Sequence, residues 1–315
     1  MKIQEISFRS YTIPFSNGWV RSGFLVQLKS DIGKEAFGDI APLPNWSKET
    51  IEEALQQYEI NKEKLLQTAW SLDSYGKELE TLDLYPSVSF GLESALLTLL
   101  DPLPSHTVEV SALLMGSYEE ILDQAGLREQ EGFTSAKIKV GSLKAVQAEK
   151  IIYKLKDRFR LRIDVNRAWE TETSISFFKQ FPLDAFDYIE EPLQNPKDLI
   201  QFCHPLGIDE SFPKDLSLKQ LEKIPSLKAL IYKPMLQGGL LQARPLSIWA
   251  VQKGIDLVLS SSFESSLGLM HIASMAHRLS LKTPVGIGTY HHAKKIDQIL
   301  VCNPNTLRRG LAEIS

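Results

Sequence analysis

Charged side chains follow a series of short apolar runs in the middle of the 315-residue chain. Five runs carry them: residues 135–141 include Lys137 and Lys139, residues 161–166 include Asp164 and Asn166, residues 187–192 include Glu190 and Glu191, residues 206–211 include Asp209 and Glu210, and residues 229–234 include Lys233. Charged side chains are seldom buried unless they are paired or bind something. Apolar runs that repeatedly end in charge therefore predict an active site at strand ends.

Three of the acids, Asp164, Glu190 and Asp209, end consecutive runs and would repel one another if those ends converge. We therefore expect a cation between them. Ligation by oxygen alone favours Mg²⁺, with Mn²⁺ as a substitute. Helix capping or pairing with surface lysines would explain one acid more easily than three in register. Neighbours on a strand point to opposite faces, so the spacing leaves open the choice between Glu190 and Glu191, and between Asp209 and Glu210.

The lysines supply the complementary chemistry. Lys137 and Lys139 are two residues apart and share one face of a strand, whereas Lys233 ends a strand on the far side. Near other cations in a dry cavity, the pKa of a lysine falls and the amine can act as a base. Acids, a metal and opposed lysines suit removal of a proton α to a carboxylate, with the enediolate held on the metal. The alternative, a lysine that extends to solvent, fits Lys137 best.

Repeated strand–helix units are expected to position these residues. From residue 108 onward, apolar runs alternate with amphipathic segments. Besides the runs above, we expect strands at 108–114, 256–260 and 284–288, and helices at about 117–130, 143–159 and 265–279. Successive functional residues from Asp164 to Lys233 are 26, 19 and 24 positions apart, about the length of one strand, one helix and two loops. Seven or eight such units predict a closed barrel with functional groups at its carboxyl-terminal strand ends.

An open doubly wound sheet is the competing fold, but it places catalytic groups mainly at one switch point. No glycine-rich phosphate loop is present, because Gly286-Ile-Gly288 is too short for a dinucleotide fingerprint. Residues 1 to about 45 predict an antiparallel sheet with a turn at 31–33. Ser47 is expected to cap the helix that follows, another helix is expected from about 87 to 100, and the proline-rich link near 104 predicts the end of an α+β module.

The composition excludes several classes of protein. The net charge is −4, 43% of residues are hydrophobic, and 23% are charged, so nothing favours a nucleic-acid or membrane partner. Only two cysteines occur, which fits a reducing compartment. No apolar run approaches the roughly 18 residues of a membrane span. We expect a cytoplasmic protein with a small-molecule partner, either a monomer or a small homo-oligomer.

The motifs resemble the enolase superfamily, in its muconate-lactonising-like branch. Lys137-Ile-Lys139, Glu190-Glu191-Pro192 and Asp209-Glu210-Ser211 are similar to its base and metal motifs. The stretches 38–44, 87–94, 161–169 and 260–268 narrow the resemblance to the o-succinylbenzoate synthase family. The resemblance implies a modified TIM barrel of the (β/α)7β type at 105–289, under an α+β capping domain at 1–104 completed by 290–315. It also implies Asp164, Glu190 and Asp209 as ligands and Lys139 and Lys233 as catalytic residues.

The implied reaction is the dehydration of 2-succinyl-6-hydroxy-2,4-cyclohexadiene-1-carboxylate, a dicarboxylate, to o-succinylbenzoate in menaquinone biosynthesis. Lys139 would take the α-proton, and Lys233 would stabilise the planar anion from the other face. Lys137 and Asn166 would support them, and Arg162 would orient Lys139.

The second carboxylate of the substrate needs a site of its own. Candidates are the backbone and side chains of Ser260, Ser261 and Ser262 and the turn at Gly238 and Gly239, although ordinary capping explains such runs equally well. The loop 16–23 is expected to close the pocket, with Gly18 and Gly23 as hinges. The alternative activity is an N-succinylamino-acid racemase or dipeptide epimerase of the same superfamily, which would use both lysines as bases.

Overall fold

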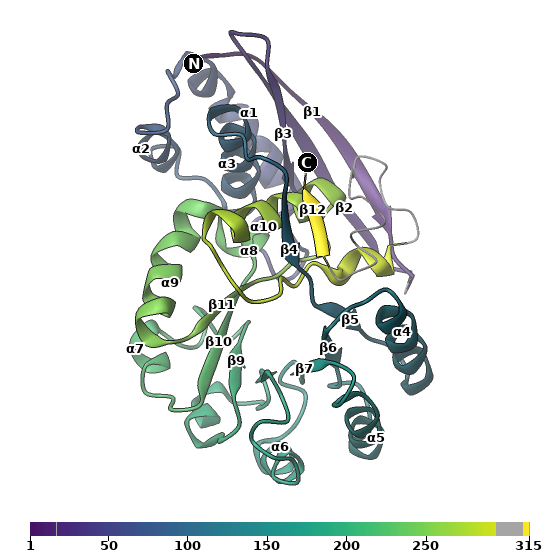
Figure 1. Cartoon of the computed structure of the whole chain (residues 1–315). Helices are drawn as coiled ribbons and strands as arrows, with labels where there is room; N and C mark the ends of the chain where they lie inside the picture. The colour runs from purple at the N-terminus through teal and green to yellow at the C-terminus, as the bar shows by residue number, and fades with distance from the viewer. Residues whose placement is uncertain (17, 294–310, 315) are drawn as a thin grey trace.

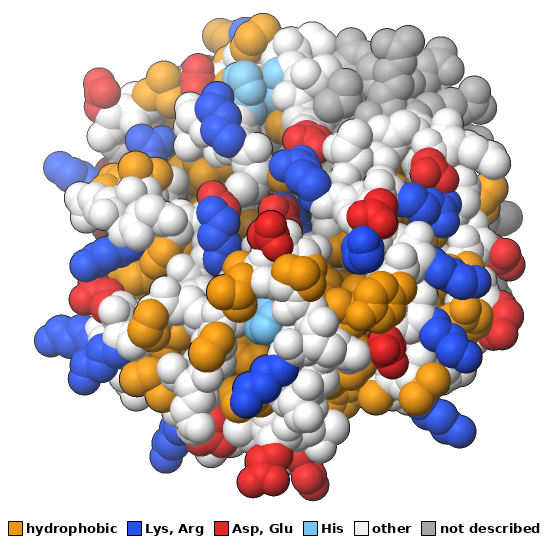
Figure 2. Space-filling view, turned by 60° about the horizontal axis from the view of Figure 1, so that its bottom comes forward, with side chains coloured by type: hydrophobic (Ala, Val, Ile, Leu, Met, Phe, Trp, Pro, Cys, Tyr) orange, Lys and Arg blue, Asp and Glu red, His pale blue; other side chains and the backbone are white. Residues whose placement is uncertain are grey.

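The computed structural model describes residues 1–16, 18–293 and 311–314. Figure 1 shows the amino-terminal elements lying together against one end of a curled parallel sheet, with helices around the outside of that sheet. Among the helices in these residues, none has the length and apolar character that a membrane span requires. On the face shown in Figure 2, basic and acidic side chains are interspersed.

The amino-terminal part is an antiparallel sheet packed on three helices. The strands β1 (Ile3–Pro14), β2 (Val20–Ser30) and β3 (Glu35–Ile40) pair in that order, and the helices are α1 (Ile51–Gln67), α2 (Tyr75–Glu80) and α3 (Pro86–Leu100). The expected turn between β2 and β3 contains Gly33 at φ +77°, a conformation that favours glycine. We call this part, residues 1–104, the cap.

Seven parallel strands form the barrel in sequence order. They are β5 (Ala112–Leu114), β6 (Ser135–Lys139), β7 (Arg160–Asp164), β8 (Tyr188–Glu190), β9 (Leu206–Ile208), β10 (Leu227–Tyr232) and β11 (Asp256–Leu259). Two isolated parallel bridges, Val110–Val285 and Ser260–Gly286, join the last strand to the first. The short eighth run expected at 284–288 therefore completes the (β/α)7β modified TIM barrel through single bridges rather than a regular strand.

Helices of very different length cover the barrel. They are α4 (Tyr118–Gln130), α5 (Ala145–Leu155), α6 (Thr171–Phe178), the 3₁₀ turn η1 (Pro196–Gln201), α7 (Leu218–Leu221), α8 (Pro234–Gln237), α9 (Leu240–Lys253), α10 (Ser266–Arg278) and the 3₁₀ turn η2 (Gly288–His292). In α5 the buried residues are Ala148, Ile151, Ile152 and Leu155, the spacing of one helix face. This periodicity explains why the expected helices at 117–130, 143–159 and 265–279 are present.

Two local predictions are wrong. The run 108–114 is divided, because β4 (His106–Glu109) leaves the barrel and pairs antiparallel with β12 (Leu311–Ile314). The cap of α1 is Thr50 rather than Ser47, since the Thr50 side chain accepts from the Glu53 N–H and the Glu53 side chain accepts from the Thr50 N–H. The Ser47 hydroxyl instead accepts from the Leu43 N–H in the preceding turn.

The domain boundaries remain a proposal, with the cap at 1–104, completed by 290–315, and the barrel at 105–289. Much of that carboxyl-terminal segment, 294–310 and 315, lies outside the described residues. Its strand β12 pairs with β4, which belongs to the range proposed for the barrel.

Candidate active site

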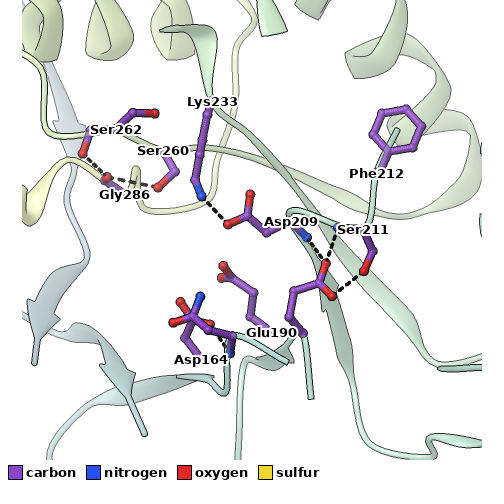
Figure 3. A network of polar contacts seen from close by, with 12 residues as sticks. Asp164, Glu190, Asp209, Ser211, Phe212, Lys233, Ser260, Ser262 and Gly286 are labelled. Atoms are coloured by element: carbon purple, nitrogen blue, oxygen red, sulfur yellow. Dashed lines mark hydrogen bonds and ion pairs between the residues drawn. The ribbon is translucent and has the colours of Figure 1, made fainter. Parts of the chain in front are cut away.

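The three predicted metal ligands lie at adjacent strand ends. Asp164 ends β7 and is in register with Glu190, which ends β8, while Asp209 directly follows β9. None is more than 3% exposed. Figure 3 shows these carboxylates and Lys233 around one interior space. Parallel pairing therefore brings together residues that are up to 45 positions apart in the chain.

The predicted lysines contact these acids directly. Lys137 Nζ lies 2.8 Å from Asp164 Oδ2 and 2.6 Å from Glu190 Oε1. Lys139 Nζ lies 3.1 Å from Asp164 Oδ2 and donates to Asn166 Oδ1 at 2.8 Å. From the opposite side, Lys233 forms an ion pair with Asp209 (Figure 3). The structure thus brings Asp164, Glu190 and Asp209 together with the three predicted lysines.

Burial and charge shift the pKa values of these groups strongly. Burial, with a contribution from the nearby Asp164 carboxylate, raises the pKa of Glu190 to about 8. The pKa of Asp164 is lowered, because Lys137 and Lys139 outweigh its burial. Burial alone would lower the pKa of Lys233, but the Asp209 carboxylate outweighs it and the pKa is raised. The expected lowering is therefore not found at Lys233, since it lies beside a carboxylate rather than another cation.

The donor set fits a hard divalent cation. The available donor atoms are carboxylate oxygens, which Mg²⁺ prefers as ligands. Glu190 Oε2 is buried and accepts no hydrogen bond within the described chain, so it has a free acceptor in the space between the strand ends. In the described residues, no three acids, histidines or cysteines lie close enough together to bind one metal ion. Instead, the ammonium groups of Lys137 and Lys233 form ion pairs with the carboxylates.

The structure distinguishes the neighbouring acids. Glu191 Oε1 accepts from the backbone N–H groups of Asp209 and Ser211, both at 2.9 Å, and Oε2 accepts from the Ser211 hydroxyl at 2.6 Å. Both oxygens of Glu191 therefore fix the loop that follows β9, which favours Glu190 as the ligand. Glu210 lines a second pocket together with Asp209, Asn166 and Lys233.

Arg162 has a different role from the predicted one. It is 2% exposed, donates to Asp187 Oδ2 at 3.1 Å and to the Pro284 carbonyl at 2.8 Å, and lies 5.1 Å from the centre of the Tyr188 ring. In the described chain its hydrogen bonds do not include Lys139. Arg162 therefore closes the floor of the cavity and ties β7 to the run that completes the barrel.

The interior cavity combines the chemical groups with part of the predicted substrate site. Its lining includes Lys137, Lys139, Glu190, Lys233, Ser260 and Ser261. Ser262 is not part of this lining. Its N–H donates to the Glu264 carboxylate. Gly238 and Gly239 also lie outside it, at the junction of α8 and α9. Ser260 and Ser261 are thus the better placed candidates for the second carboxylate.

Sequence reasoning missed several lining residues, namely Ser111, Phe263 and Thr289. Phe263 packs against Phe15 and Trp19 of the cap, with ring centroids 5.3 Å apart in each pair. An aromatic residue after β11 gives no local sign of such a contact. The expectation that loop 16–23 lies over the pocket is consistent with this packing.

The predicted hinge at Gly23 is wrong. Gly23 lies inside β2 and pairs with Tyr11, and a Cβ there would lie 2.5 Å from the Tyr11 hydroxyl oxygen. Close packing rather than motion explains this glycine. Gly18, at φ +85°, does lie in the turn between β1 and β2.

Comparisons with known families cover most of the chain. The family described as MenC, N-terminal domain, matches residues 10–99, and the family described as enolase C-terminal domain-like matches residues 120–314. The o-succinylbenzoate synthase of Pasteurella multocida is 31% identical, covering 91% of this chain and 89% of its own. That of Edwardsiella ictaluri is 36% identical, covering 85% of this chain and 82% of its own.

Solved structures share the fold at lower identity. The MenC structure from Desulfotalea psychrophila has a TM-score of 0.79 at 20% identity, with 99% of both chains covered. A dipeptide epimerase from Enterococcus faecalis, solved with Mg and the dipeptide L-Leu-L-Tyr, has a TM-score of 0.84 at 18% identity, covering 100% of this chain and 98% of that chain. With the closer curated relatives, the matches show that the chain belongs to the o-succinylbenzoate synthase family of the enolase superfamily.

Proposed function

We propose that the chain is a hydro-lyase that dehydrates 2-succinyl-6-hydroxy-2,4-cyclohexadiene-1-carboxylate to o-succinylbenzoate in menaquinone biosynthesis. The observation that carries the mechanism is the placement of Lys139 and Lys233 in one cavity, on either side of three strand-end carboxylates. This arrangement supports a mechanism in which a base, a fixed cation and a metal ion would surround one small molecule.

Asp164, Glu190 and Asp209 would hold Mg²⁺, for which Mn²⁺ could substitute. The bound cation supplies positive charge against the negative charge that develops on the ring carboxylate as the proton leaves. Lys137 holds Asp164 and Glu190 in place through contacts of 2.8 and 2.6 Å, and partly offsets their repulsion.

Lys139 acts as the proton carrier. Its neutral amine takes the proton from the ring carbon that bears the carboxylate, and the C–H electrons move toward that carboxylate. The bond from the neighbouring carbon to its hydroxyl then breaks, and the Lys139 ammonium returns a proton to the hydroxyl on the same face. Water leaves, the ring becomes aromatic, and the amine is regenerated. Asp164 and Asn166 hold Nζ in place during both transfers.

Lys233 supplies fixed positive charge on the other face of the ring. Its ion pair with Asp209 holds it in the cavity, and its Nζ lies 5.8 Å from the centre of the Trp46 ring of the cap. A cation there stabilises the planar anion as it forms. Ser260 and Ser261, in the same lining, are proposed to bind the succinyl carboxylate.

A comparison of substrates tests this proposal. Purified protein with Mg²⁺ is given the cyclohexadiene carboxylate, an N-succinylamino acid or a dipeptide, in separate assays. We expect an ultraviolet signal of o-succinylbenzoate with the first substrate at a much higher kcat/KM than for epimerisation of the others. Faster epimerisation, detected as loss of optical rotation, would instead identify the racemase or epimerase alternative.

A further inference from the structure

Two buried carboxylates of the cap reach across to the barrel, and the mechanism above does not use them. Asp39 on β3 is fully buried, and Glu93 on α3 is 1% exposed. An acid buried in this way is costly unless hydrogen bonds satisfy it. Both acids find their donors at the first turns of barrel helices, Glu93 at α9 and Asp39 at α10. Figure 1 shows α3 lying over these helices at the junction of the two parts.

Glu93 caps α9 from outside that helix. Its Oε1 and Oε2 accept from the Leu241 N–H at 3.1 and 3.3 Å. The residue before the helix is Gly239, which has no side chain to satisfy the free N–H groups of the first turn. A Cβ at Gly239 would collide with the Glu93 carboxylate. The glycine is therefore explained by the approach of Glu93.

Asp39 holds the residue that caps α10. Its Oδ2 accepts from the Ser265 N–H at 3.0 Å and from the Ser265 hydroxyl at 2.7 Å. The same hydroxyl accepts from the Gly268 N–H in the first turn of the helix. On the cap side, the Tyr11 hydroxyl donates to Asp39 Oδ1 at 2.7 Å. One carboxylate thus connects the cap sheet to the start of α10.

The two capped helices follow the strands that form one wall of the active site. Lys233 directly precedes α8, and a pair of glycines joins α8 to α9. Ser260, Ser261 and Phe263 of the cavity lining lie between β11 and Ser265. Each of these segments is held by its strand at one end and by a carboxylate of the cap at the other.

The two carboxylates belong to one closely packed unit. A Cβ at Gly38 would collide with the carbonyl oxygen of Gly91, so β3 and α3 approach as closely as their backbones allow. The His271 ring of α10 also contacts the Phe37 carbonyl of β3 at 2.9 Å. A displacement of the cap would therefore move both helix starts together.

We propose that Glu93 and Asp39 are positioning residues, through which the cap fixes Lys233 and the Ser260–Phe263 wall relative to the catalytic carboxylates. The inference rests on the proposed function for its kinetic consequences. Lys233 acts on the anion formed during the reaction, so loosening of its segment lowers kcat more than it raises KM. Loosening of the Ser260–Phe263 wall instead raises KM.

The kinetic test compares Glu93→Met, which removes both acceptors, with Glu93→Gln, which keeps one. We expect Glu93→Met to lower kcat about tenfold or more with little change in KM, and Glu93→Gln to restore most of the loss. Glu49→Met is the matched control, because Glu49 is a buried acid of the cap that accepts from Ser87 at the start of α3 and forms no hydrogen bond with a barrel helix in the described chain. An equal fall of kcat in the Glu49 variant, or none in Glu93→Met, would overturn the proposal.

Gly239→Ala provides a second variant, in which no buried acid is substituted. Its Cβ would displace the Glu93 carboxylate. A fall in kcat with unchanged KM supports the proposal. A rise in KM with unchanged kcat would show that Gly239 binds substrate, and would contradict the positioning role.

Amide hydrogen exchange tests the contact without any substrate. We expect exchange in residues 240–243 to be about tenfold faster in Glu93→Met than in the wild type, and unchanged in Glu49→Met, because only the first variant frees the Leu241 N–H. Unchanged exchange in Glu93→Met would refute the contact. If the wild type does not dehydrate the cyclohexadiene substrate, the proposed function is wrong. The exchange measurement still shows whether Glu93 of the cap holds the first turn of α9.

Discussion

Lys139 and Lys233 have different surroundings although they line the same cavity. Lys139 shares one carboxylate oxygen of Asp164 with Lys137 and also donates to the neutral Asn166 amide, whereas Lys233 has Asp209 as its ion-pair partner. A shared carboxylate and an amide hold an ammonium less strongly than an unshared carboxylate does. Lys233 is therefore held in one position more firmly than Lys139, which suits the fixed charge proposed for Lys233.

At the residue scale, we predict that Lys139→Ala abolishes dehydration while Mg²⁺ binding survives. Loss of a general base typically costs about 10²- to 10⁴-fold, so kcat should fall by at least about 10²-fold. Steady-state kinetics and calorimetric Mg²⁺ titration measure the two effects. Lys144→Ala is the control, because Lys144 follows the same strand but is exposed. Undiminished turnover in the Lys139 variant would exclude the proposed base.

A second residue-scale prediction concerns the ligands. Asp209→Asn should weaken Mg²⁺ binding by more than the roughly 10- to 100-fold typical of lost supporting groups, because a ligand charge is removed. Isothermal titration calorimetry measures the affinity. Glu210→Gln should change it little, since Asp209 rather than Glu210 forms the ion pair with Lys233 at the strand ends. If Glu210→Gln weakened Mg²⁺ binding and Asp209→Asn did not, Glu210 rather than Asp209 would be the ligand.

At the element scale, the site depends on how strands end and helices begin. Asp164 and Glu190 are held by register, and the loop after β9 is held by Glu191 through Ser211. On the opposite wall the strands lead into α9 and α10, whose first turns are capped by acids of the cap. The barrel is therefore fixed on one side by its own loops and on the other by a second structural unit.

The acid that caps α9 should also make stability depend on pH. Burial raises the pKa of Glu93 from its usual value of 4.5 to about 7, and the groups that face it, the Leu241 and Leu240 N–H, Arg244 and Tyr75, only partly offset this. The native state therefore binds the proton more tightly than the unfolded state. The stabilisation is complete below about pH 4.5 and is lost as the pH rises through about 7.

We predict that the free energy of unfolding of the wild type, relative to Glu93→Gln, falls by up to about 3 kcal/mol between pH 4.5 and pH 8. Urea denaturation of both proteins across this range measures the difference. Because other acids titrate in both proteins, only the difference between the two reports on Glu93. A difference that stayed constant with pH would show that Glu93 titrates normally.

At the scale of the whole molecule, the cap and the barrel together make one cavity. Phe263 of the barrel packs on Phe15 and Trp19 of the cap, and Trp46 of the cap lies near Lys233. The cap therefore contributes to the site through aromatic cover as well as through its buried acids. Relative movement of the two parts would change the shape of the substrate site.

We predict that Phe263→Ala raises KM about tenfold and lowers kcat less, because aromatic contacts of about 0.5–1.5 kcal/mol each that hold the wall are lost. Kinetics with the cyclohexadiene substrate measure both constants. Phe8→Ala removes a comparable aromatic cluster with Phe24 and Tyr58, remote from the cavity, and should affect stability alone. An unchanged KM in the Phe263 variant would argue against a role for this wall in binding.

The sequence predicted most of the barrel because its signals are local. A strand or helix is recognisable from the period of its apolar residues. The charged strand ends recur every 19 to 26 residues, about the length of one strand–helix unit. Prediction from local patterns failed where the residues in contact are far apart in the sequence. The strand at 108–114 is divided because β4 pairs with β12, and Gly238 and Gly239 resembled an anion-binding turn because Glu93 is almost 150 positions away. Gly23 resembled a hinge because its close contact with Tyr11 arises only when β1 and β2 pair.

By itself, the sequence determined which side chains meet at the strand ends, since residue spacing and parallel pairing fix both face and level within a barrel. Spacing left open the choice between Glu190 and Glu191, and the resemblance implied Glu190. The tertiary structure supplies a physical reason, because Glu191 is hydrogen-bonded to the loop after β9. It alone also revealed that the cap holds the far wall of the site. Contacts between Glu93 and α9, and between Asp39 and Ser265, join segments that no periodicity relates.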